Sequence, residues 1–278
     1  MSGQVPDGPL PDYASPPVVE VVFAVAVEPI RVPLMDLSAF ALGAFGEEFP
    51  IRQEQPPMRM VSESFDNPQT VQLHLMLGLL SGQSPVRLWL QSEDQSRLIQ
   101  LQTDWMACNW QKAGGAGEYP RYGVIEEFFL SAWGKVADFA AEQTGVVPTP
   151  LQCELSYINQ ILPGELWDRP GQLSRVLTLA GDPNGFLPEA EDGQLAFRYR
   201  IPHGGRDVGR MYVQAVPAVR PADMTPVIQL NLTARGTPLV EGREGMVAFF
   251  RLAHEWIVRG FAAVTTEAAQ ERMWERRR

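Results

Sequence analysis

The sequence predicts an α+β protein made of two tandem β-α-β(3–4)-α repeats, in which a curved antiparallel sheet packs against two long helices. Three observations support this fold class. Several short segments alternate apolar and polar residues, as strands with one buried face do. Two longer segments, 122–143 and 245–264, carry apolar residues at helical spacing along one stripe. The same order of elements then occurs twice along the 278 residues, which predicts an internal duplication.

The first repeat, residues 16–145, is expected to contain a strand, a helix, three strands and a second helix. Apolar residues alternate from Val19 to Val27 in its first strand. Gly145 and Pro148 end its last helix, because glycine tolerates the left-handed conformation and proline cannot continue a helix. The expected ranges are Val18–Glu28, Leu34–Phe49, Val71–Leu79, Arg87–Gln91, Ile99–Ala107 and Tyr122–Gln143, with a weaker fourth strand at Met58–Val61.

The second repeat, residues 146–278, shows the same order with a shorter helix after its first strand. A stripe of apolar residues from Met246 to Val264 marks the long closing helix. Residues 1–15 precede the first repeat and are rich in Pro, Gly and Ser, so we expect a flexible N-terminal arm there. The expected ranges of the second repeat are Leu151–Tyr157, Gln172–Ala180, Leu195–Ile201, Arg210–Val216, Val227–Arg235 and Gly245–Val264.

Short strings recur in the two halves in one common order, which is a second reason to predict a duplication. RLWLQ at 87–91 is similar to RMYVQ at 210–214, and LIQLQT at 98–103 is similar to VIQLNLT at 227–233. Both closing helices contain FFxxA, and both first strands contain a Glu, in EVVF and in ELSY. Each match alone is what any strand or helix shows by chance, so the prediction depends on their shared order.

The repeated element order resembles the saddle of the TATA-binding protein and the related helix-grip folds, in which an antiparallel sheet curls around long helices on one face. This resemblance implies a fold and not a function. A DNA-binding saddle needs a basic concave face with Phe wedges, whereas the formal net charge here is −10. Nucleic acid is therefore the least favoured partner. The face opposite the helices is expected to carry Gln100, Gln102, Asp104, Gln229, Asn231 and Thr233.

Several longer strings resemble a sporadically distributed, uncharacterised family of bacterial proteins of similar length. They are PPVVEVVFAV near the start, LIQLQTDWMACNW followed by YPRY, ELSYINQI at mid-chain and AHEWI in the last helix. The resemblance spans residues 16–274. It brings no established activity with it, so neither a reaction nor a site residue follows from it.

Two asparagines are expected to end the helix-facing sides of two strands. Alternation past Ala107 places Asn109 on that side, and alternation from Cys153 places Asn159 there. A β-α-β connection leaves both strands pointing the same way, so both asparagines are expected at one rim of the sheet. The other candidate ligand-binding residues around this rim are Trp110, Tyr122, Tyr157, Gln160 and His254, and Tyr119 is expected beside them.

Two interpretations of this rim remain open. In the first, each asparagine ends its strand by hydrogen bonding loop backbone, as Asn commonly does, and AGGAGEYP is a plain connection. In the second, the same residues line a small pocket with a polar rim and aromatic walls, between the sheet and the helices. We rank the first interpretation ahead of the second, because sequence alone places loops poorly.

The sequence contains no recognisable motif of a reaction or a cofactor. The histidines His74, His203 and His254 are scattered, and HEWIV lacks the second His of a zinc-binding HExxH motif. Cys108 and Cys153 fall on apolar strand faces, where a thiol behaves as a small hydrophobe, and no disulfide is expected. We therefore expect no metal and no cofactor.

These observations favour a binding or adaptor protein that holds a protein partner or a small ligand at the rim between sheet and helices. The alternative is an enzyme that uses His254, Glu255 and Asn159 in an unfamiliar arrangement, and the third candidate is a nucleic-acid-binding saddle. The N-terminus lacks the basic and apolar regions of a signal peptide, and no apolar run approaches the roughly 18 residues of a membrane helix. A cytoplasmic location without membrane contact is expected, and the oligomeric state stays open.

Overall fold

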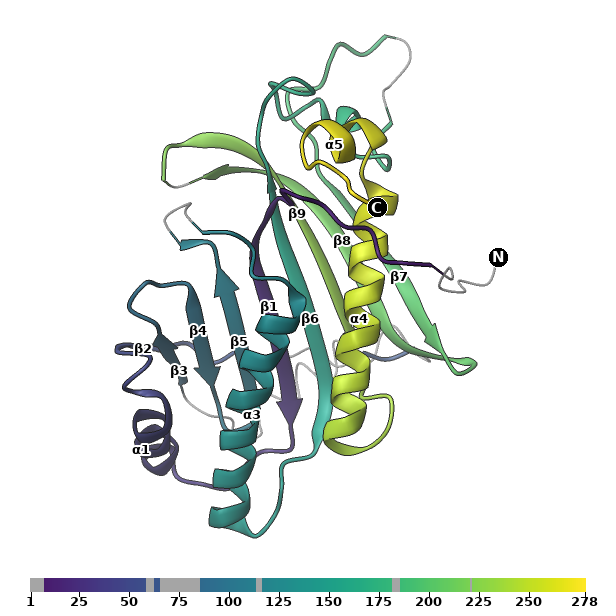
Figure 1. The fold of residues 1–278 in the computed structure, drawn as a ribbon. Helices are drawn as coiled ribbons and strands as arrows, with labels where there is room; N and C mark the ends of the chain where they lie inside the picture. The colour runs from purple at the N-terminus through teal and green to yellow at the C-terminus, as the bar shows by residue number, and fades with distance from the viewer. Residues whose placement is uncertain (1–7, 59–62, 66–85, 114–116, 182–185, 221) are drawn as a thin grey trace.

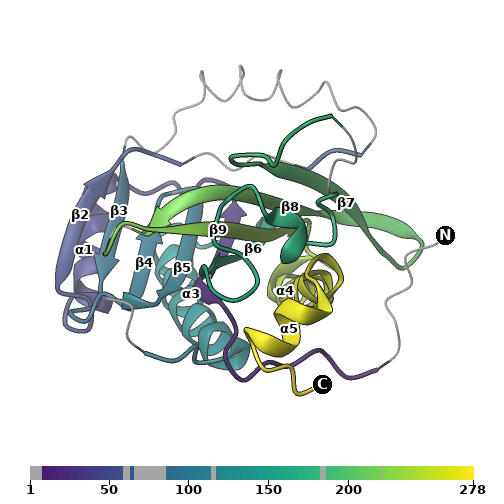
Figure 2. The same cartoon turned by 90° about the horizontal axis from the view of Figure 1, so that it is seen from above.

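The computed structural model describes residues 8–58, 63–65, 86–113, 117–181, 186–220 and 222–278. Among these residues, nine strands form one open antiparallel sheet, and the two long helices α3 (Tyr122–Thr144) and α4 (Gly242–Val264) cover one face of it (Figures 1 and 2). The order across the sheet is β2-β3-β4-β5-β1-β6-β9-β8-β7. The predicted α+β class with an antiparallel sheet is confirmed.

Most of the predicted elements are present, with ends that differ by a few residues. The strands are β1 Val18–Val27, β2 Ile51–Gln55, β3 Arg87–Gln91, β4 Arg97–Leu101, β5 Trp105–Gln111, β6 Pro150–Ile161, β7 Leu195–His203, β8 Arg206–Arg220 and β9 Thr225–Gly236. The shorter helices are α1 Leu34–Phe45 and α5 Glu267–Arg272. No helix in the described ranges is both long and apolar enough to cross a membrane.

The core lies between the sheet and the helices, and β1 runs through its centre. Val21, Phe23 and Val25 point from β1 toward the helices and are completely buried. The Phe23 ring lies 5.5 Å from the Phe129 ring of α3 and 5.0 Å from the Phe250 ring of α4, measured between centroids. Full burial stabilises such a side chain by about 1.5–3 kcal/mol. One aromatic cluster therefore joins the middle of the sheet to both long helices.

Helix α3 ends where the sequence predicts. Gly145 adopts a φ of 75°, a conformation that glycine reaches without steric cost, and its N–H donates to the Ala141 carbonyl at 2.8 Å. Helix α1 ends at Phe45, earlier than predicted. The Phe40 ring of α1 stacks at 4.3 Å on Phe139 of α3, so α1 extends the helical layer over one end of the sheet.

One predicted strand is wrong, because Ile99–Ala107 is two strands joined by a tight turn at residues 102–104. Leu101 pairs with Met106 across this turn. Odd-numbered residues such as Leu101 face the helices in β4, and even-numbered residues such as Met106 face them in β5. Alternation does not carry across the turn. Each residue of β5 therefore lies on the face opposite to the predicted one.

The helix predicted at Gln172–Ala180 is also wrong, because only Leu173–Arg175 form a turn of 3₁₀ helix. Leu177, within that range, instead makes a β-bridge to Thr265. Strand β2 was not predicted, since it is a largely exposed edge strand without apolar alternation, and α5 is too short to show helical spacing. The strand predicted at Val71–Leu79 and most of the one at Met58–Val61 lie outside the described residues.

The strand order is mirrored about the central pair β1 and β6, as Figure 1 shows. Outward from β1 come β5, β4 and β3, and outward from β6 come β9, β8 and β7. The two long helices follow β5 and β9, which occupy matching places. The similar strings do not: RLWLQ forms β3 but RMYVQ lies in β8, and LIQLQT begins in β4 but VIQLNLT lies in β9. The mirrored order pairs β3 with β7 and β4 with β8. In each pair of strings, the second string therefore lies one strand nearer the centre of the sheet than the mirrored order predicts.

Part of the predicted N-terminal arm packs against the C-terminal residues. Tyr13 is 5% exposed, forms a β-bridge with Arg276 and lies with its ring 5.4 Å from that of Phe261 in α4. The Ala14 N–H donates to the Glu275 carbonyl at 3.1 Å. Residues 13 and 14 of the arm therefore contact the C-terminal residues and α4.

Candidate functional site

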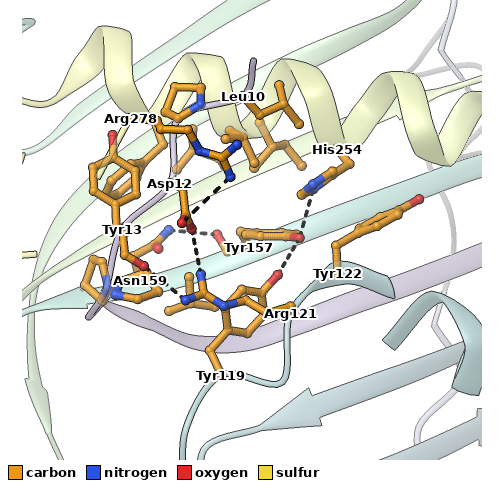
Figure 3. Close-up of a pocket in the computed structure, with 18 of the residues that line it drawn as sticks. Leu10, Asp12, Tyr13, Tyr119, Arg121, Tyr122, Tyr157, Asn159, His254 and Arg278 are labelled. Atoms are coloured by element: carbon orange, nitrogen blue, oxygen red, sulfur yellow. Dashed lines mark hydrogen bonds and ion pairs between the residues drawn. The ribbon is translucent and has the colours of Figure 1, made fainter. Parts of the chain in front are cut away.

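A cavity of about 290 Å³ lies between the N-terminal arm, the loop before α3, the strands β6 and β9, and helix α4 (Figure 3). Ligand pockets commonly measure about 300–1,000 Å³, so this cavity suits a small ligand. Its apolar wall includes Val18, Leu232, Ile257, Val258 and Phe261. Its polar lining comes from Asp12, Tyr119, Arg121, Tyr157, Asn159, His254 and Arg278.

Three polar side chains form a hydrogen-bonded chain along this cavity. The hydroxyl oxygens of Tyr119 and Tyr157 are 2.9 Å apart, and the Tyr157 hydroxyl lies 3.1 Å from Nδ1 of His254 (Figure 3). The protons along the chain are coupled. If Tyr157 donates to Nδ1, then Nε2 carries the imidazole proton; in the other tautomer, Nε2 is an acceptor. Nε2 has no partner of its own among the described residues.

Burial keeps the three groups of this chain uncharged near pH 7. It raises the pKa of Tyr157 well above its ordinary value and raises the pKa of Tyr119 to about 12. It lowers the pKa of His254 to about 4, because a positive imidazolium is poorly solvated there. The chain therefore offers neutral donors and acceptors to a ligand.

Asn159 supplies a fixed acceptor to the same cavity. The residue is 1% exposed, and its Nδ2 donates to the Leu230 carbonyl of β9 at 2.9 Å, which sets the orientation of the amide. Its Oδ1 has no hydrogen-bond partner within the described part of the chain. Because Asn159 lines the cavity, Oδ1 can accept a hydrogen bond from a ligand that donates one.

Tyr122, in the first turn of α3, packs on the imidazole. The two rings stack with centroids 4.0 Å apart and an angle of 17° between their planes. The Tyr122 hydroxyl donates to Oε1 of Glu126 at 2.9 Å. Burial raises the pKa of Tyr122, and the neighbouring Glu126 carboxylate raises it further. The stack restricts rotation of His254 and so fixes the direction of its unpaired Nε2.

Charged residues gather where the arm, the loop before α3 and the C-terminal residues meet (Figure 3). Oδ1 of Asp12 accepts from Nη1 of Arg121 at 3.1 Å, and Oδ2 lies 3.9 Å from Arg277 and 4.0 Å from Arg278. Nη2 of Arg121 donates to the Tyr13 carbonyl at 3.1 Å. These contacts hold the arm over the cavity and form a mouth with more positive than negative side chains.

The structure brings together most, but not all, of the residues predicted at the rim. Tyr122, Tyr157, Asn159 and His254 line the cavity. Asn109 does not, because the turn between β4 and β5 places it on the face of the sheet away from the helices. The prediction that both asparagines share one helix-facing rim is therefore wrong.

Asn109 takes part in a polar network on that opposite face. Its Nδ2 donates to Oε1 of Glu20 at 2.6 Å, and its Oδ1 accepts from Gln100 at 2.7 Å. Gln111 donates to the same Glu20 oxygen at 2.9 Å. The amide of Asn109 is thus fully engaged with neighbouring strands, whereas that of Asn159 keeps an unpaired oxygen.

Trp110 and Gln160 lie near the cavity without lining it. Trp110 faces the helices, with its ring 5.6 Å from that of Tyr119. Gln160 lines a neighbouring open groove of about 1,030 Å³, together with Lys112 and Arg220. Trp110 therefore packs against Tyr119 without lining the cavity, and Gln160 lines the neighbouring groove instead.

Three charged residues of the site were not assigned to it from the sequence: Asp12, Arg121 and Arg278. The position of Arg121 between Tyr119 and Tyr122, in YPRY, was the available signal for that residue. No local pattern predicts Asp12, because its place depends on how the arm packs on the C-terminal residues.

Other chemically reactive groups lie away from the cavity. Cys108 and Cys153 are fully buried and unbridged, and burial raises the pKa of both thiols. Glu255 pairs with Arg259 at 3.0 Å and does not line the cavity. His203 is the last residue of β7, before the turn to β8, and His74 lies outside the described residues. Within the described ranges, no group of three or more His, Cys, Asp or Glu side chains is arranged to hold a metal ion.

No protein-family model matches this chain, and no curated protein matches it in sequence.

Proposed function

We propose that this protein binds a small organic ligand in the cavity between the N-terminal arm, β6 and α4. One observation carries the proposal: two hydrogen-bonding atoms without partners among the described residues, Oδ1 of Asn159 and Nε2 of His254, belong to residues that line one small, largely apolar cavity. Binding sites commonly combine apolar walls with a few placed polar groups.

The ionisation of the site supports binding rather than proton transfer. A general acid or base works best when its pKa is near the working pH. The pKa of His254 is lowered to about 4, and those of Tyr119 and Tyr157 are raised. Glu255, the carboxylate in the alternative enzymatic arrangement, is engaged with Arg259 outside the cavity. Neutral groups with fixed geometry favour recognition of a ligand.

The test is a screen of a fragment library by protein-observed NMR, with two matched variants of the protein. Asn159→Leu removes the unpaired acceptor, and Asn109→Leu makes the same change on the opposite face of the sheet. We expect fragments whose shifts map to Tyr157 and His254, lost in Asn159→Leu and retained in Asn109→Leu. If no fragment perturbs the cavity, or if both variants bind equally well, the proposal is wrong.

We also propose that the chain arose by duplication of one β-α-β(3–4)-α unit. The mirrored strand order about β1 and β6, and the two long helices after β5 and β9, support this origin. The helix-grip resemblance fits the same arrangement. Superposition of residues 16–145 on 146–274 tests it, and the proposal fails if α3 and α4 do not coincide after the superposition.

A further inference from the structure

We propose that the ligand of this cavity is a small organic carboxylate whose anionic group takes the place of the Asp12 carboxylate at Arg121. This inference rests on the proposed ligand-binding function and names the chemical class of the ligand. Its basis is the arrangement of charge at the mouth, the backbone of Arg121 and the apolar wall behind them (Figure 3).

The mouth of the cavity holds an excess of positive charge in a protein of formal net charge −10. Three guanidinium groups, those of Arg121, Arg277 and Arg278, lie within 4.0 Å of the single Asp12 carboxylate. Asp12, Arg121 and Arg278 all line the cavity. One carboxylate compensates only one of these charges, so a second anion at this mouth would still be attracted.

The backbone of Arg121 adopts a conformation that is costly for a residue with a side chain. Arg121 has φ of 73° and ψ of 159°, a region that residues with a side chain rarely occupy. Such a conformation costs about 1–3 kcal/mol and occurs often at ligand sites. The side chain is braced as well, since it donates to the Tyr13 carbonyl and lies 5.8 Å from the centre of the Tyr119 ring. Arginine so placed presents a planar fork that matches a carboxylate.

The rest of the cavity selects an apolar body behind the anionic group. Leu232, Ile257 and Phe261 form one side, and within the described residues the cationic side chains of the lining are those of Arg121 and Arg278. A ligand with several charges would place some of them against the apolar wall, where an unpaired charge is costly. A single carboxylate on a compact hydrocarbon or aromatic body fits both parts.

Asp12 occupies the anion position weakly enough to be displaced. Its side chain is 27% exposed and that of Arg121 is 48% exposed, and ion pairs with such exposure stabilise by about 0–1 kcal/mol. A ligand carboxylate can therefore replace Asp12 at Arg121 with little loss. In this arrangement Asp12 competes with the ligand, so its removal should strengthen binding.

The test compares benzoate with benzamide, which has nearly the same shape and no charge, by calorimetry on the full chain. We expect benzoate to bind at least about tenfold more tightly, a difference of about 1.4 kcal/mol. Asp12→Asn should raise the affinity for benzoate, and Arg121→Gly should lower it to that of benzamide. Arg169→Gln is the control, because Arg169 pairs with Glu189 away from the cavity and its change should alter nothing.

Melting temperatures accompany these titrations. Glycine accepts the φ of Arg121 without strain, so Arg121→Gly should stay folded; Arg278→Gln, at an exposed side chain, is a second variant that should weaken benzoate binding in part. Equal binding of the two probes, no binding of either at millimolar concentration, or weaker benzoate binding in Asp12→Asn would each overturn the carboxylate inference. Fragment binding that depends on Asn159 would still support the proposed function in those cases.

Discussion

The hydroxyl of Tyr157 lies 3.1 Å from Nδ1 of His254, although the two residues are 97 positions apart in the sequence. Tyr157 faces the helices from β6, and His254 faces the sheet from the middle of α4. Their contact joins the strand that carries Asn159 to the helix that forms the apolar wall of the cavity. The geometry of the candidate site therefore depends on this pair.

The first prediction concerns the Tyr157 hydroxyl, which lies at the centre of the hydrogen-bonded chain from Tyr119 to His254. Tyr157→Phe removes the partner of both Tyr119 and His254, so we expect the free energy of unfolding to fall by about 1–3 kcal/mol. Tyr119→Phe removes only the end of the chain and should cost about 0.5–1.5 kcal/mol. Urea denaturation measures both. Equal losses in the two variants would show that the hydrogen bonds of Tyr119 and His254 are not coupled through the Tyr157 hydroxyl.

The second prediction concerns the pH dependence of stability. The pKa of His254 is lowered to about 4 in the folded state by burial, against an ordinary value of 6.5. Between these values only the unfolded state takes up the proton, so this group lowers stability as the pH falls from 6.5 to 4 and adds no further loss below 4. The full effect is on the order of 3 kcal/mol.

His254→Gln isolates this effect from the other titrating groups. The variant cannot take up the proton, so its free energy of unfolding should change less between pH 6.5 and pH 4 than that of the unaltered protein. Urea denaturation at several pH values measures the two slopes. Parallel slopes would show that His254 titrates normally in the folded state.

Strong periodic patterns in the sequence predicted the elements that form the core. The stripe from Ile125 to Phe139 and the alternation from Val19 to Val27 are both governed by burial on one face, which the order of residues records directly. The face of Asn109 was predicted wrongly for an equally physical reason. A turn of three residues after Leu101 changed which residues point inward, and no residue in it signals that change.

The sequence predicted mainly those residues of the site that lie on these periodic strands and helices. Tyr157 and Asn159 follow from alternation in β6, and His254 from its place on α4. Asp12 belongs to an arm whose composition resembles disorder, and its position is decided by the packing of Tyr13 on Phe261. Contacts of that kind join residues across the whole chain and leave no local pattern.

The third prediction concerns two glycines that face each other in β8 and β9. Gly209 pairs with Gly236, and a Cβ at Gly236 would lie 2.2 Å from the Val208 carbonyl oxygen and 2.6 Å from the Phe249 ring. We expect Gly236→Ala to lower the free energy of unfolding by about 1–3 kcal/mol through overpacking. Gly134→Ala in α3 meets no atom within 4 Å and should raise it by about 1 kcal/mol. Thermal denaturation should separate the two substitutions by sign, and a stabilising Gly236→Ala would contradict the packing described.

The last prediction concerns the two thiols, which lie on the strands at either side of β1. Cys108 in β5 and Cys153 in β6 are both 0% exposed, and burial raises the pKa of each. The thiolate is the reactive form, so neither should react with a thiol-specific reagent in the folded protein. Separating β1 from both neighbours disrupts the centre of the sheet, and we therefore expect the two thiols to be labelled together, at a rate set by global unfolding. Mass spectrometry of a labelling time course, read with increasing urea, distinguishes the outcomes. Fast labelling of one cysteine in the absence of urea would show that one half of the sheet opens independently of the other.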